Sequence, residues 1–216
     1  MLPQQFAERA SRFHTDGGEA VEPRKAATVV LLRDLPHTAN MPGGLELYLV
    51  RRAPSMVFAG GLYAFPGGRM DDQDIDVAST AVREFQEETG VLLTELHAWS
   101  RWITPEFEPR RYDTWFYVAR QPDGKIPADV GGEADWSGWV SPKDALAKHG
   151  EAMLPPTAVT IHELAQHMTV DSVLATAEGR DLSPIRPAFV PDGAGGGHLA
   201  LPGDDDYPVV EQETQA

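Results

Sequence analysis

The sequence predicts an α+β fold with a mixed β-sheet, and three observations lead to that prediction. The chain has 216 residues, which suits one domain or one domain with an added lobe. Apolar residues make up 42% of it and charged residues 24%, so there is enough apolar material for a packed core. Short β-type segments are mixed with a few amphipathic helices in no regular alternation, which favours a mixed sheet covered by helices.

The first third of the chain predicts a loose arm followed by strands. Residues 1–23 are polar and contain a Gly-Gly pair, so we expect a loose N-terminal arm. Residues 28–32 form a β-branched and apolar run that is typical of a buried strand. Residues 45–51 alternate between apolar and polar side chains, which predicts a half-buried strand. Residues 62–65 predict a short strand that Pro66 ends.

Residues 77–89 give the clearest helix signal in the chain. Apolar side chains recur there at helical spacing, and Gly90 stands where a left-handed C-cap belongs. Ser141 before Pro142 is a typical N-cap for a later helix. The remaining predicted elements are strands over residues 98–103, 114–119 and 136–140 and helices over residues 142–149, 155–167 and 171–178.

Composition divides the chain into three parts. From Pro184 onward prolines and glycines are frequent, and residues 189–190 and 199–201 predict a small hairpin. We therefore expect the loose arm over residues 1–23, a folded domain over residues 24–180 and a Pro/Gly-rich C-terminal extension over residues 181–216.

Charge and cysteine content exclude several classes of function. Lys and Arg total 18 against 33 Asp and Glu, which gives a net charge of −15. Such a chain lacks the basic surface that nucleic acids and anionic membranes require, so we expect neither as a partner. No cysteine is present, which excludes disulfides, thiolate metal sites and a cysteine nucleophile. The first residues lack the apolar core of a signal peptide, and we expect a cytoplasmic protein.

Three glutamates of the predicted helix point to metal chemistry. Glu84, Glu87 and Glu88 stand at positions i, i+3 and i+4, which brings their carboxylates to one face of the helix. Like charges at this spacing repel one another, and a divalent cation relieves the repulsion. Carboxylate oxygens suit Mg2+ or Mn2+. Arg83 can pair with Glu87 at i+4, and the alternative for the triplet is a solvated acidic face.

The residues before this helix complete a recognisable pattern. Gly67 and Gly68 end the short strand and let the backbone approach a ligand closely. Five residues separate Gly68 from Asp74, and eight more lead to Arg83 and the run Arg-Glu-Phe-Gln-Glu-Glu-Thr-Gly-Val. This resembles the Nudix box, G-x5-E-x7-R-E-U-x-E-E-x-G-U, in which U is a bulky apolar residue. Asp74 stands where Glu is usual, and the loop before Arg83 is one residue longer.

The resemblance implies a Nudix-type α/β/α sandwich with a mixed β-sheet. It also implies hydrolysis of a nucleoside diphosphate linked to another group. By matching positions, the metal ligands and the arginine that orients them would be Glu84, Glu87, Glu88, the Gly68 carbonyl and Arg83. A metal ion neutralises the diphosphate oxygens and lowers the pKa of bound water, and a carboxylate then takes the proton. That base is Glu84 or Glu87 within the box, or Glu133, which precedes a predicted strand on a glycine-rich loop.

The segment before the box suggests a substrate. It resembles the signature of the coenzyme A diphosphatase branch, including its peroxisomal mammalian type, L-L-T-x-R-[SA]-x3-R-x3-G-x3-F-P-G-G. Leu49, Arg52, Ala53, Gly61 and residues 65–68 match it. Tyr48, Val50 and Val57 do not, and Val57 replaces an arginine. The leading hypothesis is therefore hydrolysis of coenzyme A or acyl-coenzyme A. The alternatives are a pyrophosphatase for ADP-ribose, NADH or another nucleotide, and a nucleotide-sensing Nudix protein without catalysis.

Three arginines are expected to bind substrate phosphates. Arg51 and Arg52 are adjacent, so in a strand they face opposite ways and one of them, for which we favour Arg52, faces the site. Arg111 belongs to a second cationic spot in this acidic chain. The resemblance further implies a small-molecule nucleotide as the partner and a homodimer as the assembly.

Overall fold

The structure, a computed structural model, describes residues 4–38, 43–56, 59–193 and 196–208. It divides into two compact units. The larger comprises Lys25–Ser100 and Thr114–Leu182, and the smaller comprises Met1–Arg24, Arg101–Asp113 and Ser183–Ala216. Residues 101–113 were predicted to belong to the 24–180 domain, but they group with the smaller unit.

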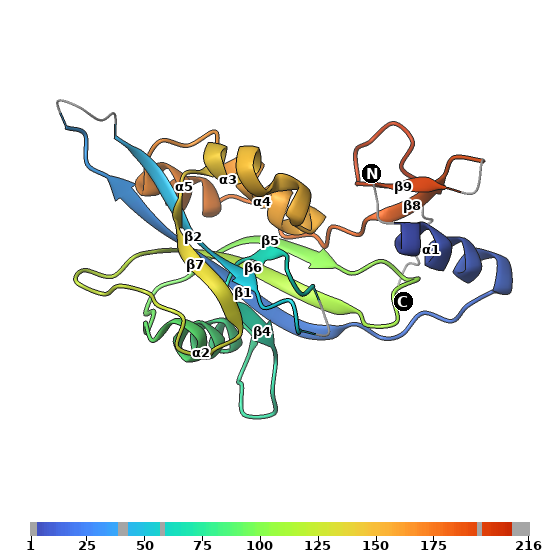
Figure 1. Cartoon of the computed structure of the whole chain (residues 1–216), viewed down its shortest axis with the longest axis horizontal. Coiled ribbons are helices and arrows are strands. Elements are labelled where there is room, and N and C mark those ends of the chain that lie inside the picture. Colours follow the sequence, from blue (N-terminus) through green and yellow to red (C-terminus); the bar gives the residue numbers. More distant parts are fainter. Residues whose placement is uncertain (1–3, 39–42, 57–58, 194–195, 209–216) are drawn as a thin grey trace. The chain divides into compact units, whose positions relative to one another are not determined.

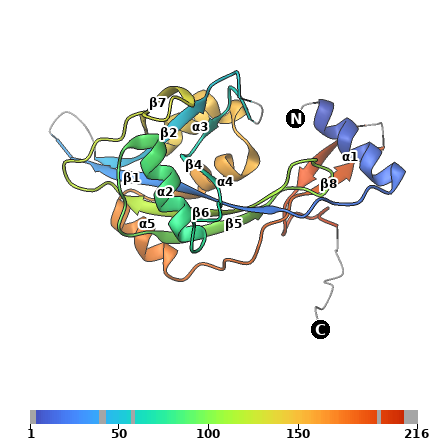
Figure 2. The same ribbon diagram turned by 90° about the horizontal axis from the view of Figure 1, so that it is seen from below.

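The larger unit is built around a seven-stranded mixed sheet. Figure 1 and Figure 2 show how its strands are arranged. Its strands are β1 (Arg24–Leu35), β2 (Gly44–Arg52), β3 (Tyr63–Ala64), β4 (Gly67–Arg69), β5 (His97–Ile103), β6 (Tyr112–Arg120) and β7 (Ala134–Val140). The order is β3-β2-β1-β6-β5, with β4 added on β1 and β7 on β2. The paired register of β1 and β2 runs from Leu32 opposite Leu47 to Leu35 opposite Gly44. Beyond it β1 pairs with β4, and β2 pairs with β3 and β7.

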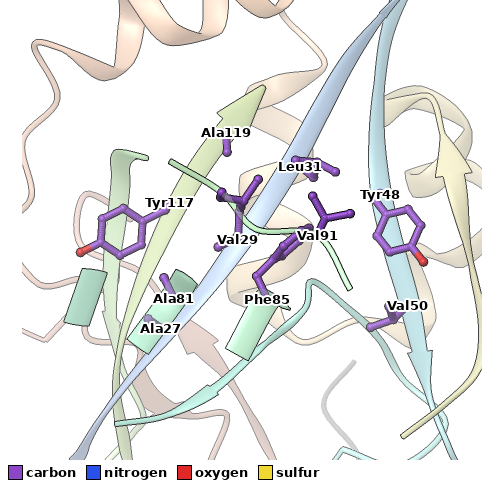
Figure 3. Packing of buried hydrophobic residues seen from close by; sticks show 11 residues of the cluster. Ala27, Val29, Leu31, Tyr48, Val50, Ala81, Phe85, Val91, Tyr117 and Ala119 are labelled. Atoms are coloured by element: carbon purple, nitrogen blue, oxygen red, sulfur yellow. The ribbon is translucent and has the colours of Figure 1, made fainter. Parts of the chain in front are cut away.

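The helix α2 (Val77–Thr89) packs against one face of the sheet. Its Phe85 is fully buried in one cluster with Val29 and Leu31 of β1 and Tyr48 of β2 (Figure 3). Val30 is equally buried but points to the other face of β1, because side chains alternate along a strand. Helices α3 (Pro142–His149), α4 (Pro155–Leu164) and α5 (Val170–Ala177) cover that other face (Figure 1). This confirms the predicted α/β/α sandwich.

The predicted helix over residues 77–89 is confirmed with the same bounds, because both of its caps are local. The Asp76 side chain accepts the Ser79 N–H and the Ser79 side chain accepts the Asp76 N–H, which forms a capping box. Gly90 ends the helix in the left-handed conformation, with a φ of 74°. The helix predicted over residues 155–167 ends at Leu164, and a short 3-10 helix, η1 (Gly150–Ala152), follows α3. None of the described helices is long and apolar enough to cross a membrane.

The smaller unit corrects one prediction and confirms another. The arm over residues 1–23 is not loose throughout, since α1 spans Gln4–Asp16. Ala10 of this helix is fully buried with Phe107 and Phe189, and the Arg9 guanidinium lies 2.9 Å from a Glu108 oxygen. These partners lie about a hundred or more residues away in the sequence, so local composition gives no sign of them. The predicted hairpin is present as β8 (Ala188–Pro191) and β9 (Gly197–Ala200).

Candidate active site

A glycine turn between β3 and β4 packs directly on β1. The Thr28 hydroxyl donates to the Pro66 carbonyl at 2.7 Å, and the Val29 N–H donates to the same carbonyl at 2.9 Å. Gly67 has a φ of 154°, and a Cβ there would lie 2.3 Å from the Ala27 carbonyl oxygen. Only glycine therefore fits at this position, and the turn is held by residues of β1 that lie far from it in the sequence.

The next glycine touches the carboxylate helix. A Cβ on Gly68 would lie 2.4 Å from Oε2 and 2.7 Å from Oε1 of Glu84. The backbone of Gly68 is thus in direct contact with a carboxylate that lies 16 positions later in the sequence. This contact brings together two of the residues that the sequence assigned to the metal.

We expect Gly68→Ala to lower kcat about 100-fold, because the new methyl group must displace the carboxylate of Glu84, which the sequence predicts to be a metal ligand. The fold should survive, since the clashing atoms are the end of a flexible side chain. Steady-state kinetics and thermal unfolding measure the two effects. Gly44→Ala is the matched control, because nothing lies within 4 Å of a Cβ at that position. A variant with wild-type kcat would contradict the assignment of this contact to the active site.

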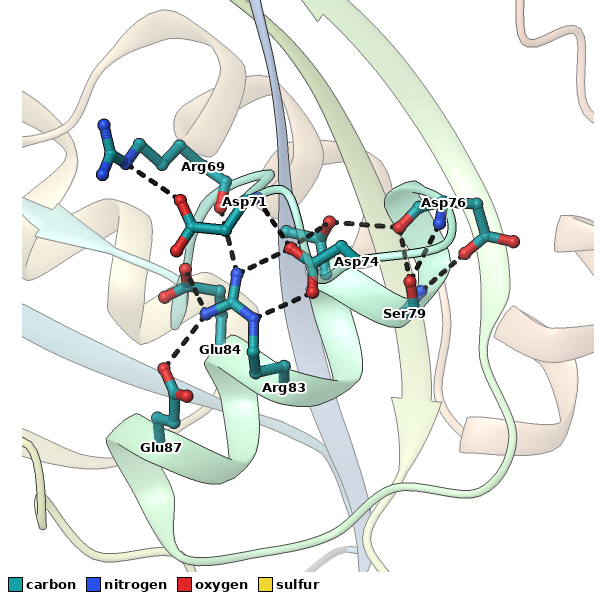
Figure 4. A network of polar contacts seen from close by, with 9 residues as sticks. Arg69, Asp71, Asp74, Asp76, Ser79, Arg83, Glu84 and Glu87 are labelled. Carbon is teal, nitrogen blue, oxygen red and sulfur yellow. Dashed lines mark hydrogen bonds and ion pairs between the residues drawn. The ribbon is translucent and has the colours of Figure 1, made fainter.

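Arg83 is the centre of a carboxylate network on α2 (Figure 4). Its Nε and Nη2 donate to the two oxygens of Asp74 at 2.9 and 2.8 Å. Its Nη1 donates to Glu84 at 2.8 Å and to Glu87 at 3.1 Å, so the pairing expected at i+4 is present. Nη2 also donates to the Arg69 carbonyl at 3.2 Å. One guanidinium therefore fixes the side chains of two predicted metal ligands.

Asp74, which replaces the usual glutamate of the box, is a structural partner of Arg83. Its side chain is 3% exposed, and it also accepts the Asp71 N–H at 2.8 Å and the Thr80 hydroxyl at 3.1 Å. The Arg83 guanidinium holds the pKa of Asp74 well below its usual range. Sequence reasoning missed Thr80 in this role, although its hydroxyl stands one helical turn before Glu84.

Glu88 is half-buried beside the glycine turn. Its Oε2 accepts the Gly67 N–H at 3.3 Å. The pKa of Glu88 is raised to about 8, mainly by burial and in part by the negative charges of Glu133 and Glu84, while the Gly67 N–H and the charge of Arg52 act to lower it. Burial also raises the pKa of Glu84. The structure thus places Glu84, Glu133 and Arg52 within electrostatic reach of Glu88.

Glu133 reaches this cluster on a loop that is tied to the end of α2. The Val130 N–H donates to the Glu88 carbonyl at 2.9 Å, and the Ala128 N–H donates to the Thr89 carbonyl at 3.2 Å. The Glu133 carbonyl in turn accepts the Ala53 N–H at 2.8 Å. The position of this loop carboxylate is therefore set by backbone contacts with α2 and with the end of β2.

The three predicted phosphate-binding arginines have different surroundings. The charge of Arg52 acts on Glu88, whereas Arg51 forms a bidentate pair with Asp135 at 2.6 and 2.8 Å. Arg111 belongs to the smaller unit, where it donates to the carbonyls of Thr104 and Val21 at 3.0 and 2.8 Å. Val57, where the coenzyme A signature has an arginine, lies outside the described residues.

The donor set fits a hard divalent cation. Carboxylate oxygens of Glu84, Glu87 and Glu88 and the Gly68 carbonyl are the ligand types that Mg2+ and Mn2+ prefer. Burial is the main cause of the raised pKa values of Glu84 and Glu88, and neighbouring carboxylates add to both. In the described part of the chain, no three acidic or histidine side chains lie close enough together to coordinate a metal ion in their present conformations. Arg83 contacts one oxygen each of Glu84 and Glu87 instead.

The pKa of Glu88 leads to a pH-dependent stability in buffer without divalent cations. The folded state binds the Glu88 proton more tightly than the unfolded state does, because folding raises the pKa of this carboxyl from about 4.3 to about 8. The folded state therefore loses stability as the pH rises from the lower value towards the higher one. We expect Glu88→Gln, which has no charge to bury, to gain stability relative to wild type between about pH 5 and about pH 8. Urea unfolding with a chelator at several pH values measures this. Glu106→Gln, at an exposed position, is the control; a difference between Glu88→Gln and wild type that is independent of pH would contradict the prediction.

Comparison with known proteins identifies the class. The model of the NUDIX domain matches residues 22–159, which is more than half of the chain. The chain therefore belongs to the Nudix family, as the box, the glycine turn and the sandwich fold indicate.

Two curated relatives and one solved structure show how far the similarity extends. The chain is 36% identical over 84 residues to the mitochondrial coenzyme A diphosphatase NUDT8 of Mus musculus, covering 34% of this chain and 39% of that protein. It is 27% identical over 186 residues to the putative nudix hydrolase 7 of Caenorhabditis elegans, covering 66% of this chain and 62% of that protein. It thus spans less than two thirds of either relative. A crystal structure of a Nudix hydrolase from Alicyclobacillus acidocaldarius superposes with a TM-score of 0.62 at 26% identity, covering 76% of this chain and 98% of that one.

Proposed function

We propose that this chain is a hydrolase that uses Mg2+ or Mn2+ to cleave the diphosphate linkage of a nucleoside diphosphate derivative. The observation that carries the proposal is the Arg83 network, because Arg83 fixes Glu84, which touches the backbone of Gly68, and also binds Glu87. Glu84, Glu87 and Glu88 and the Gly68 carbonyl would hold the metal. When bound, the metal would neutralise the diphosphate oxygens and activate water.

The residues around the metal ligands have separate tasks in this proposal. Arg52 would pair with a substrate phosphate, since its charge reaches the Glu88 carboxylate. We assign the general base to Glu133, because it is exposed at the end of a fixed loop and its charge reaches Glu88. Glu84 and Glu87 are the alternatives within the box. Arg83, which is engaged with three carboxylates, is a positioning residue.

Coenzyme A or acyl-coenzyme A is the substrate that we propose. Two observations support it, namely the upstream signature around Arg52 and residues 65–68 and the similarity to NUDT8, whose name states coenzyme A diphosphatase activity for that protein. ADP-ribose, NADH or another nucleotide is the second choice. The box carboxylates are all present, which disfavours a sensor that binds nucleotides without cleaving them.

A substrate panel tests the proposal. The protein is incubated with Mg2+ and coenzyme A, acyl-coenzyme A, ADP-ribose, NADH, diadenosine polyphosphates or deoxynucleoside triphosphates, and the products are separated by chromatography. Release of 3′,5′-ADP and 4′-phosphopantetheine from coenzyme A is the expected result. Cleavage of a different nucleotide alone would retain the hydrolase and reject coenzyme A. Binding without cleavage of any compound would overturn the catalytic proposal in favour of the sensor.

A further inference from the structure

Thr28 is a buried polar residue at a place in β1 where packing alone favours an apolar one. It interrupts residues 26–32, whose other members are all apolar and buried, and it is itself 8% exposed. Valine has nearly the same shape and would fill this place without burying a hydroxyl group. Burying a hydroxyl costs free energy unless the group is hydrogen-bonded, so the partner of Thr28 indicates what the hydroxyl does.

The partner is the backbone of the turn between β3 and β4. The Thr28 hydroxyl lies 2.7 Å from the Pro66 carbonyl oxygen and 3.1 Å from the Phe65 carbonyl oxygen, and it donates to these two acceptors. In the register of β1 and β4, Thr28 lies opposite Gly67. The hydroxyl therefore fixes the two residues that lead directly into the glycine pair.

The turn packs so closely on β1 that it cannot shift independently of Thr28. A Cβ on Gly67 would lie 2.6 Å from the Cα and 2.8 Å from the Cβ of Thr28. Closely packed interiors transmit small displacements, because there is no free space to absorb them. A change in how Thr28 holds the turn is therefore passed on to Gly67.

The same turn contacts two of the predicted metal ligands. The Gly67 N–H donates to Oε2 of Glu88 at 3.3 Å. The backbone of Gly68 touches the Glu84 carboxylate, since a Cβ there would lie 2.4 Å from its Oε2. The place of the turn thus decides where these two carboxylates find their backbone contacts.

Thr28 acts on the carboxylates only through the turn. The next residue, Val29, packs in one cluster with Phe85 of α2. Side chains alternate along a strand, so Thr28 projects to the face of β1 that α2 does not cover. Its hydroxyl orders the turn from that face, while the carboxylates lie on α2.

We propose that Thr28 is a positioning residue of the metal site, whose hydroxyl holds the glycine turn where it can contact Glu84 and Glu88. This inference rests on the proposed function for the assignment of these carboxylates to a divalent cation. Groups that orient metal ligands without touching the ion typically account for about 10- to 100-fold in metal affinity. Loss of the hydroxyl should therefore weaken metal binding although every ligand is retained.

Mn2+ binding to variants of Thr28 tests the proposal without any reaction. Thr28→Val keeps the shape of the side chain and removes the hydroxyl, whereas Thr28→Ser keeps the hydroxyl and removes a methyl group. In isothermal titration we expect Thr28→Val to bind Mn2+ about tenfold more weakly than wild type, and Thr28→Ser to stay within about twofold of wild type. Thr157→Val makes the same change at a residue of α4 that is 6% exposed, and as the matched control it should leave the affinity unchanged.

A second pair of variants keeps the test decisive if Thr28→Val does not fold. Thr28→Ala and Thr28→Ser differ only in the hydroxyl group, so the alanine variant should bind Mn2+ about tenfold more weakly than the serine variant. Circular dichroism of each variant confirms that a lost affinity does not come from a lost fold.

The outcomes separate this inference from the proposed function. If the variants without the hydroxyl lose Mn2+ affinity selectively while the wild-type protein cleaves nothing in the substrate panel, the role of Thr28 is supported and the hydrolase is rejected. If the variants with and without the hydroxyl bind Mn2+ equally, or if the wild type binds no Mn2+, the role of Thr28 is overturned, whatever the panel shows.

Discussion

Replacing Glu87 by glutamine is expected to lower kcat about 1000-fold and to leave the unfolding temperature unchanged. The substitution keeps the shape of the side chain and removes the negative charge that a metal ligand supplies, and electrostatic contributions of this kind are worth about 100- to 1000-fold in rate. Stability should persist because the Glu87 side chain is 60% exposed, and Arg83, with which it pairs at 3.1 Å, keeps its ion pairs with Asp74 and Glu84.

Kinetics and metal binding together check this prediction for Glu87. The variant should also bind Mn2+ more weakly in isothermal titration, which a purely structural glutamate would not cause. Glu95→Gln is the matched control, because it removes the same charge from a side chain that is 79% exposed and lies outside the box. Wild-type turnover in the Glu87 variant, on a substrate that the wild type cleaves, would overturn the metal assignment.

Replacing Arg83 by alanine is expected to cost about 3 kcal/mol in the free energy of unfolding, because it leaves a buried carboxylate without its cation. The carboxylate is Asp74, whose side chain is 3% exposed and which accepts two hydrogen bonds from Arg83. Arg69→Ala is the control. Arg69 pairs with Asp71 at 3.3 Å with both side chains well exposed, so its loss should cost less than about 1 kcal/mol.

Acid unfolding gives a second measurement of the Arg83 effect. The pKa of Asp74 is depressed in the folded state, so its stabilising contribution is complete above the unfolded pKa of about 3.9 and is lost as pH falls below it. Wild type should therefore lose its advantage over Arg83→Ala on acidification. If Arg83→Ala and Arg69→Ala lower the free energy of unfolding equally at neutral pH, the prediction that the Asp74–Arg83 pair stabilises the fold is wrong.

Local signals account for the parts of this protein that the sequence predicts well. The bounds of α2 follow from side chains that cap their own helix, Asp76 and Ser79 at one end and Gly90 at the other. The pairing of Arg83 with Glu87 follows from the i+4 spacing, and the C-terminal hairpin follows from two apolar segments across a glycine-rich turn. Each of these features involves residues that are close to one another in the chain, so local backbone conformation is enough to bring the residues together.

The box residues were predicted as a set, but their separate surroundings were not. Helical spacing alone treats Glu84, Glu87 and Glu88 alike, whereas the fold buries Glu88 against the Gly67 N–H and leaves Glu87 exposed. The difference arises because one side of α2 faces the glycine turn and the loop that ends at Glu133. The pKa of Glu88 depends on that burial and could not be inferred from spacing.

Residue spacing along one helix and one turn was enough to predict the carboxylate helix, and its resemblance to the Nudix box implied the family and the sandwich fold. The contacts between distant segments could be seen only in the folded structure. It placed Ala10 in a core with Phe107 and Phe189, where a loose arm was expected. It paired Arg51 with Asp135, which lies 84 positions away, and set both beside Trp136. Such contacts depend on strand register and helix packing. They join residues that are far apart in the chain, so the sequence around each residue does not predict them.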